Sequence, residues 1–201
     1  MYYYLEGTVT IIGQNLAVID IGGAGYACMT TLHTLSHLET GKKTRLYTYC
    51  NVKEDAFDIY GFYDLSEKRC FEQLLGVSGV GPRAALSILS SATPESLAMA
   101  IISDDEKALT IAPGIGKKLA QRIMLELKDK VSKETAAMKA SGYALPGGDK
   151  GQPGANQRDA AAALAVLGYT QGEISAALRS IDTSTLTVEE IIKEVLKNSI
   201  K

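Results

Sequence analysis

The stretch that decides the fold reads GVSGVGPRAALSIL, from Gly76 to Leu89, and a related stretch, APGIGKKLAQRIML, runs from Ala112 to Leu125. An offset of 35 residues places the glycines of the two stretches in register. Each copy predicts a helix, a short glycine turn and a second helix, because glycine readily adopts the left-handed conformation that such turns require. The aligned turn positions are Gly79 with Gly114, Val80 with Ile115, and Gly81 with Gly116.

Both turns predict contacts with phosphate. The helix after each turn presents unpaired backbone N–H groups, and its dipole favours an anion there. Arg83 follows the first turn, and Lys117 and Lys118 follow the second. Such contacts grip a nucleic-acid backbone without reading its sequence. The expected DNA-binding residues are therefore Gly79, Val80, Gly81, Arg83, Gly114, Ile115, Gly116, Lys117 and Lys118.

Two other nucleotide-binding patterns fit these stretches less well. GVGPRAA loosely matches a dinucleotide fingerprint, but that fingerprint follows a strand, and here a helix is expected before it. GIGKKL lacks the earlier glycine and the Ser or Thr of a P-loop, so no ATP site and no cofactor are predicted. A single turn of this kind could merely cap a helix, but two copies in register, both followed by basic residues, favour the DNA-binding interpretation.

Residues 1–63 predict a five-stranded barrel of the OB type. Segments rich in Tyr, Ile, Val and Thr alternate with turns that contain Gly or Asn, and one short helical piece follows the third candidate strand. Eight of the ten tyrosines lie in this segment. Tyrosines with the period of a strand favour a core or a subunit interface over stacking on bases.

Residues 64–134 predict five or so short helices, and the sequences DLSE and SDDE each match a capping box. Residues 135–156 are rich in Gly and Pro and predict a flexible linker. Residues 157–201 predict three more helices, of which the second and third open with Thr-x-x-Glu. The expected fold class is thus α+β, with a barrel, a tandem helix–hairpin–helix domain, a linker and a small helical tail.

Composition limits the function. The chain has 201 residues and a net charge of −2, which argues against a general polyanion binder, so any DNA contact must be local. Three cysteines without a C-x-x-C pair suit a reducing compartment.

The N-terminus shows no signal-peptide pattern, and we expect a soluble cytoplasmic protein. His33 and His37 have helical i, i+4 spacing, but no third ligand is evident, so no metal site is predicted.

The whole chain resembles the RuvA family, the Holliday-junction-binding subunits of a bacterial branch-migration complex. The resemblance rests on VKEDAFDIYGF, SGVGPRAALSIL, PGIGKKLAQRI and ALAVLGY. Ser78 replaces a common Asn and Arg83 a common Lys, and neither change should abolish phosphate binding. The resemblance implies a UBA-like tail and a homotetramer bound to four-way junction DNA, with one or two tetramers for each junction left open.

The resemblance also assigns roles to the tail and to the predicted hairpin tip between the fourth and fifth strands. Glu54 and Asp55 match the acidic pin at the junction centre, although such a pair is more commonly a solvated turn; Lys53 beside them is an expected DNA contact. The tail would bind the RuvB ATPase motor, with the RuvC resolvase left open as a further partner. The residues expected to bind RuvB are Leu164, Leu167, Tyr169 and Ile174, for which the alternative is the core of the tail itself.

These features predict a non-catalytic subunit, with ATP hydrolysis supplied by the partner. The alternative is a DNA-repair enzyme, either a glycosylase or a nuclease, because helix–hairpin–helix turns occur in both. A glycosylase would need a catalytic carboxylate soon after its hairpin, and Asp104 and Asp129 are the available candidates. Each of them lies in an ordinary helix-end or surface context, which favours the non-catalytic interpretation.

Overall fold

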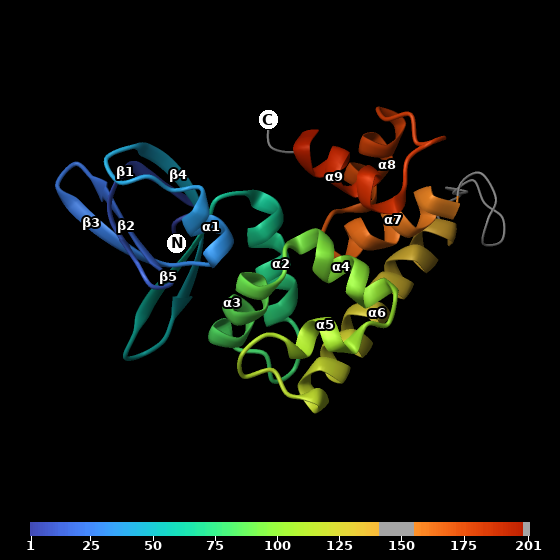
Figure 1. Cartoon of the computed structure of the whole chain (residues 1–201), viewed down its shortest axis with the longest axis horizontal. Helices are drawn as coiled ribbons and strands as arrows, with labels where there is room; N and C mark the ends of the chain where they lie inside the picture. Colours follow the sequence, from blue (N-terminus) through green and yellow to red (C-terminus); the bar gives the residue numbers. More distant parts are fainter. Residues whose placement is uncertain (141–154, 199–201) are drawn as a thin grey trace.

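The structure, a computed structural model, describes residues 1–140 and 155–198. Figure 1 shows the strands gathered at one end of the molecule and the helices packed together at the other. The change from a strand period to a helical period, expected at Asp64, falls at this boundary: β5 ends at Phe62 and α2 begins at Leu65.

The N-terminal segment is a closed barrel with the strand order β1-β2-β3-β5-β4, which confirms the predicted five strands and the helix after the third. β3 pairs with β5 in parallel, and the other neighbours are antiparallel. The buried side chains inside the barrel are Leu5, Val9, Ile19, Cys28, Leu46 and Ile59. The elements are β1 (Tyr4–Gly13), β2 (Leu16–Ile21), β3 (Ala24–Met29), α1 (Leu32–Ser36), β4 (Lys43–Val52) and β5 (Phe57–Phe62).

The tyrosines of the barrel differ in burial. Tyr60 is buried and stacks on Phe71 of α2 with a centroid separation of 5.2 Å, so it belongs to the core, as expected. Tyr2, Tyr3 and Tyr4 are exposed at the N-terminus and the start of β1. The predicted core packing is therefore confirmed for Tyr60, whereas for these three the other predicted location, a subunit interface, stays a prediction.

Glu67 ties the barrel to the helices and corrects the predicted capping box at Asp64. The Asp64 side chain accepts from the Glu67 N–H at 2.7 Å, so the N-cap is present. The Glu67 carboxylate does not return to Asp64; it is buried and accepts from the hydroxyls of Thr31 and Thr34 in the α1 region. Thr34 in turn accepts from the Tyr63 N–H at 2.8 Å. Burial raises the pKa of the Glu67 carboxyl, and the two hydroxyls oppose this.

Five helices follow the barrel, within the part of the chain that the structure describes, but the last is not short. It runs for 24 residues, past the domain end expected at 134. The capping box expected in SDDE is wrong: Asp105, not Ser103, caps α5 and accepts from two backbone N–H groups. The helices are α2 (Leu65–Leu75), α3 (Pro82–Ser91), α4 (Pro94–Ile102), α5 (Glu106–Thr110) and α6 (Lys117–Ala140).

The tail contains the three predicted helices, α7 (Ala155–Val166), α8 (Gln171–Arg179) and α9 (Val188–Asn198). Both Thr-x-x-Glu boxes are confirmed by reciprocal hydrogen bonds, one between Thr170 and Glu173 and one between Thr187 and Glu190. The linker expected at 135–156 is shorter at both ends, because α6 includes 135–140 and α7 begins at Ala155. The rest of that expectation, 141–154, lies outside the described residues.

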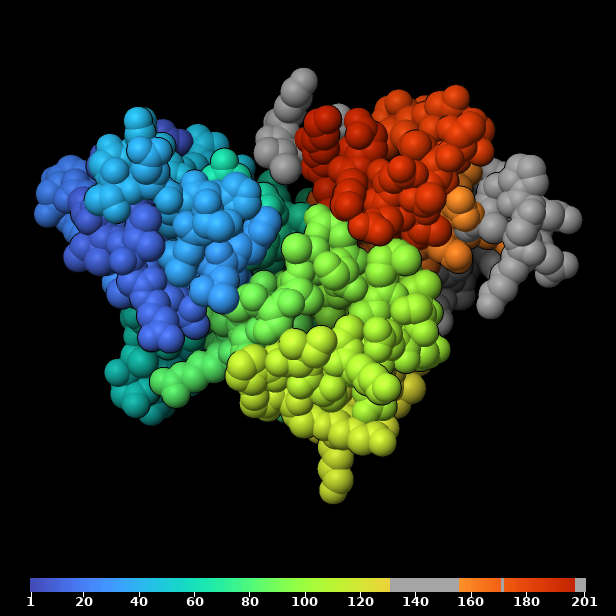
Figure 2. Space-filling model, in the orientation of Figure 1, coloured from blue at the N-terminus to red at the C-terminus, as the bar shows by residue number. Residues whose placement is uncertain are grey.

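The tail packs directly on the central helices. Figure 2 shows its surface continuous with that of α4, and the buried residues of both parts form one cluster. Arg69 of α2 pairs with Glu173 of α8 at 2.7 Å and lies 4.5 Å above the ring of Tyr169. Hydrogen bonding to Arg69 lowers the pKa of Glu173 to about 2. The ion pair therefore stabilises this packing above pH 4.5, the ordinary pKa of the group, and loses its effect as the pH falls toward 2.

No single helix within residues 1–140 and 155–198 is long and apolar enough to cross a membrane. The helices α3 and α4 together meet the length and composition criteria, but they are bent by 93° at their junction. Their apolar side chains, among them Leu86, Leu89, Leu97 and Ile101, are buried in the helical core.

Candidate nucleic-acid interface

The first hairpin connects α2 to α3 and has the predicted backbone. Gly79 has a φ of +87°, and Val80 is only 6% exposed, with its N–H bonded to the Val77 carbonyl at 3.1 Å. Gly81 caps α3 without a side-chain hydrogen bond, and a Cβ added there would meet no atom within 4 Å. The start of α3 is therefore open to a ligand, with Arg83 exposed beside it.

The second hairpin connects α5 to α6 and repeats this geometry. Gly114 has a φ of +83°, Ile115 is 5% exposed, and its N–H bonds to the Ala112 carbonyl at 3.1 Å. A Cβ on Gly116 would also meet nothing within 4 Å. Two exposed lysines, Lys117 and Lys118, form the first residues of α6. The register predicted from the glycines is confirmed.

The cations at the two turns are available to an external anion. In the part of the chain that the structure describes, no ion pair engages Arg83, Lys117 or Lys118. Each lies within the first two residues of its helix, where the backbone N–H groups and the helix dipole also favour negative charge. The arrangement can bind phosphate by combining directed amides with mobile charges.

The two turns lie close to each other. The Ser87 hydroxyl on α3 donates to the Pro113 carbonyl of the second turn at 2.7 Å. Arg122 on α6 donates to the Ser78 carbonyl of the first turn at 3.4 Å. The sequence did not identify these two side chains as part of the site, although the same 35-residue offset that aligns the glycines also aligns Ser87 with Arg122.

The acidic residues predicted for the pin lie at the tip of the β4–β5 hairpin. Val52 pairs with Phe57, and the Lys53 N–H donates to the Ala56 carbonyl at 2.8 Å, which closes the turn. Glu54 and Asp55 are exposed there, as is Lys53. Figure 1 shows this hairpin extending away from the body of the barrel, on the side of the molecule where α3 lies.

The residues predicted to form a docking face on the tail are not at the surface, which contradicts their expected exposure. Leu164 and Leu167 are fully buried, and Tyr169 and Ile174 are 5% and 1% exposed. All four belong to the one buried cluster that the tail forms with the central helices. The alternative weighed for these residues, a place in the core, is the observed one.

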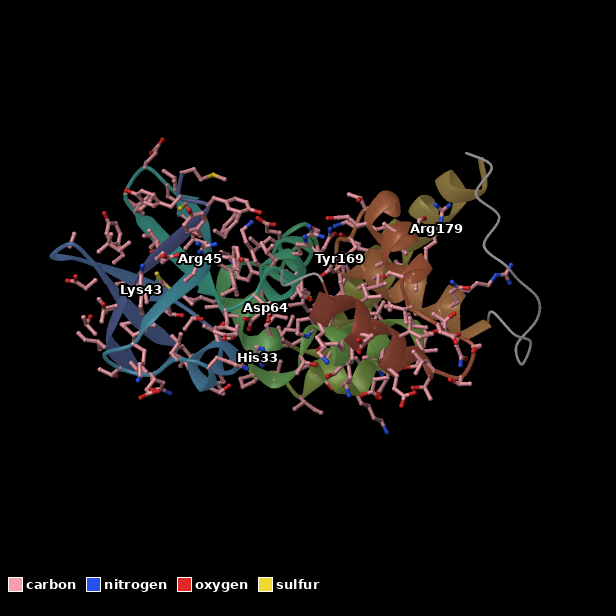
Figure 3. The ribbon with its side chains drawn as sticks, turned by 90° about the horizontal axis from the view of Figure 1, so that it is seen from above. His33, Lys43, Arg45, Asp64, Tyr169 and Arg179 are labelled. Atoms are coloured by element: carbon pink, nitrogen blue, oxygen red, sulfur yellow. The ribbon has the colours of Figure 1, made fainter. Side chains whose placement is uncertain are left out.

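One group with metal-ligating atoms was missed from the sequence. His33, Asp64 and Glu67 offer ligand atoms within 4.8 Å of one another, and His33 lies 3.7 Å from Asp64 (Figure 3). The ring of His37, which the sequence paired with His33, lies 4.6 Å from the His33 ring and also stacks on Tyr63 at 4.5 Å. Asp64 caps α2 and Glu67 accepts two threonine hydroxyls, so both carboxylates have structural roles.

The candidate catalytic carboxylates have ordinary surroundings. Asp104 has a left-handed φ of +59° at the end of α4, and its side chain is 74% exposed and pairs with Lys128 at 2.5 Å. Asp129 is exposed on α6. Neither has the enclosed surroundings that a glycosylase needs around its carboxylate.

Comparisons with known proteins cover nearly the whole chain. Residues 1–61 match the model of the RuvA N terminal domain, 71–129 the SAM-like helix-hairpin-helix tandem, and 155–199 the RuvA C-terminal domain. A protein of Caldanaerobacter subterraneus subsp. tengcongensis is 43% identical over 100% of both chains. One from Acetivibrio thermocellus is 40% identical over 98% of both. Both relatives are named Holliday junction branch migration complex subunit RuvA, and the present chain belongs to the RuvA family.

Proposed function

We propose that this chain binds four-way junction DNA, independently of sequence, as the non-catalytic subunit of a branch migration complex. The observation that carries the proposal is the pair of aligned turns, each with a left-handed glycine, an open helix start and exposed cations without ion-pair partners among the described residues. A relative that is 43% identical over the full chain is named Holliday junction branch migration complex subunit RuvA. ATP hydrolysis is assigned to the RuvB partner.

Binding would proceed through phosphates. The amides at the starts of α3 and α6 would hold phosphate oxygens, and Arg83, Lys117 and Lys118 would add charge. Because such contacts carry no base information, preference for a junction must come from the arrangement of several turns in space. A homotetramer would supply four pairs of turns for four duplex arms. The exposed tyrosines Tyr2, Tyr3 and Tyr4 are a candidate part of its interface.

The hairpin tip would act by repulsion. Glu54 and Asp55 are exposed on an extended hairpin, and carboxylates near a strand crossover repel phosphates. The DNA strands would then be directed away from the hairpin tip and toward the two basic turns. Lys53, next in the chain, would contact DNA beside the tip.

The tail would bind the RuvB motor through a surface other than its core. Leu164, Leu167, Tyr169 and Ile174 are buried between α7, α8 and the central helices, so they would support the tail rather than contact a partner. Residues 1–63 would then serve assembly and the pin, 64–134 DNA binding, and 157–201 motor binding.

Gel-shift titrations test the proposal with a four-way junction and a linear duplex of matched sequence at one salt concentration. The expected result is tighter binding to the junction. E54Q/D55N should raise the affinity for the linear duplex more than that for the junction and so reduce the junction preference, because the tip would no longer repel a duplex that lies across it. Equal affinity of the parent protein for the two DNAs would contradict the proposed function. An unchanged preference in the variant would contradict the role of the tip alone.

A further inference from the structure

Two hydrogen bonds cross between the hairpins. The Ser87 hydroxyl, on the helix after the first turn, donates to the carbonyl of Pro113 in the second turn at 2.7 Å. Arg122, on the helix after the second turn, donates from Nη1 to the carbonyl of Ser78 in the first turn at 3.4 Å. Each helix that begins at one turn therefore holds the other turn.

The two bonds are related by the internal repeat. The offset that aligns Gly79 with Gly114 also aligns Ser78 with Pro113 and Ser87 with Arg122. Both acceptors are backbone carbonyls immediately before the left-handed glycine, and both donors lie on the helix that follows the opposite turn. Different side chains thus make equivalent contacts in the two copies, which is the pattern of a reciprocal brace.

The one asymmetry in the brace has a chemical reason. The Ser78 N–H donates to the Glu126 carboxylate at 3.2 Å. Its counterpart in the second turn, Pro113, has no N–H, so nothing there needs an acceptor. Ser91, which aligns with Glu126, instead donates to the Ser87 carbonyl at 3.0 Å within its own helix. An acceptor side chain is therefore present at the turn that has a free backbone N–H and absent at the turn that has none.

We propose that Ser87 and Arg122 are positioning residues that couple the two phosphate-binding turns into one clamp of fixed spacing. The inference rests on the proposed function and deepens it. Directed amides bind phosphate well only when they are already oriented, because ordering a loose turn during binding costs free energy. The brace fixes both turns before DNA arrives. The contribution of Ser87 would come from its hydrogen bond to the Pro113 carbonyl and not from a bond to DNA.

S87A tests the brace, with S91A as the matched control on the same helix and S87T as the conservative rescue. Amide hydrogen exchange without DNA is the first measurement. In S87A the Ile115 N–H, which bonds to Ala112, should exchange faster by up to about 10-fold, the worth of one ordinary hydrogen bond. S91A and S87T should exchange like the parent.

Junction affinity and its salt dependence are the second measurement. S87A should weaken binding by about 3- to 10-fold with an unchanged slope of log affinity against log salt, because no phosphate contact is removed. When K117A/K118A has already disabled the second turn, S87A should cost much less. That non-additivity is the signature of coupling between the turns rather than of a general loss of stability.

R122K probes the other half of the brace while keeping the positive charge. The Val80 N–H in the first turn should then exchange faster, and the exchange of Ile115 should be less affected. Parent-like exchange in both S87A and R122K, or equal effects of S87A and S91A, would overturn the inference. A parent protein without junction preference would instead contradict the proposed function, and the exchange results would remain interpretable because they require no DNA.

Discussion

The turn between α2 and α3 and the turn between α5 and α6 repeat one backbone geometry with different side chains. Their left-handed glycines have φ values of +87° and +83°, and the apolar side chains that follow, Val80 and Ile115, are 6% and 5% exposed. The first turn leads through Pro82 to the single cation Arg83, whereas the second leads directly to Lys117 and Lys118. In the proposed function, the backbone would therefore fix the position of a phosphate, and the side chains would fix how much positive charge it meets.

The largest predicted difference between the turns is in their electrostatics. K117A/K118A should weaken junction binding at least about 100-fold, at about 1.4 kcal/mol for each of two lost phosphate contacts, and should reduce the slope of log affinity against log salt by the equivalent of up to about two contacts. R83A should reduce the slope of log affinity against log salt by the equivalent of about one phosphate contact. Fluorescence anisotropy over a range of salt concentrations measures both quantities. The reason for the difference is the number of cations at each helix start.

A charge-matched control for the double variant is K193A/K197A on α9, outside both turns. It should leave the salt slope close to that of the parent protein. If R83A and K117A/K118A changed the slope equally, the second turn would hold no additional phosphate contact. The two turns would then be equivalent in charge as well as in backbone geometry.

The next prediction concerns that shared backbone. G79A and G114A should each lower the free energy of unfolding by about 1–2 kcal/mol, because alanine is disfavoured at positive φ. The two losses should be similar, since an added Cβ at Gly79 makes only an ordinary 3.5 Å contact with Arg122 and meets nothing at Gly114. Denaturant unfolding measures them.

G81A is the matched control for the first turn, because Gly81 has a φ of −94° that alanine tolerates. Its free energy of unfolding should change by less than about 1 kcal/mol, because the lower entropy of the unfolded chain offsets the poorer N-cap propensity of alanine. Its junction affinity should nevertheless fall, since the new methyl group would occupy the open space in front of the helix start. A loss of stability in G81A comparable to that in G79A would show that positive φ is not what distinguishes the two positions.

The sequence predicted the features that depend on neighbouring residues. The hairpin glycines, the cap at Asp64 and the Thr-x-x-Glu boxes all follow from chemistry within a few positions of the chain. The barrel follows from the strand period and the turn residues between strands. The internal repeat gave the register of the two turns, because a repeated pattern is difficult to obtain from helix capping alone.

The features that the sequence missed depend on contacts between distant segments. Glu67 has the spacing of a capping box, but burial beside Thr31 and Thr34 supplies stronger partners than its own helix start. Leu164 and Leu167 have the pattern of a buried face, but the pattern does not say which surface covers them. In the fold both leucines join the buried cluster that the tail forms with the central helices.

The smallest predicted effect separates the turns at a single backbone N–H. E126Q replaces the charged acceptor of the Ser78 N–H with a neutral one of similar shape, and should cost about 0.5–1 kcal/mol of stability. Val80 should show faster amide exchange and Ile115 should not. S91A, the aligned change in the other copy, should have no such effect on Ile115, because Pro113 has no N–H to lose a partner. Equal changes at both turns would mean that the brace acts through the shared core rather than through these individual bonds.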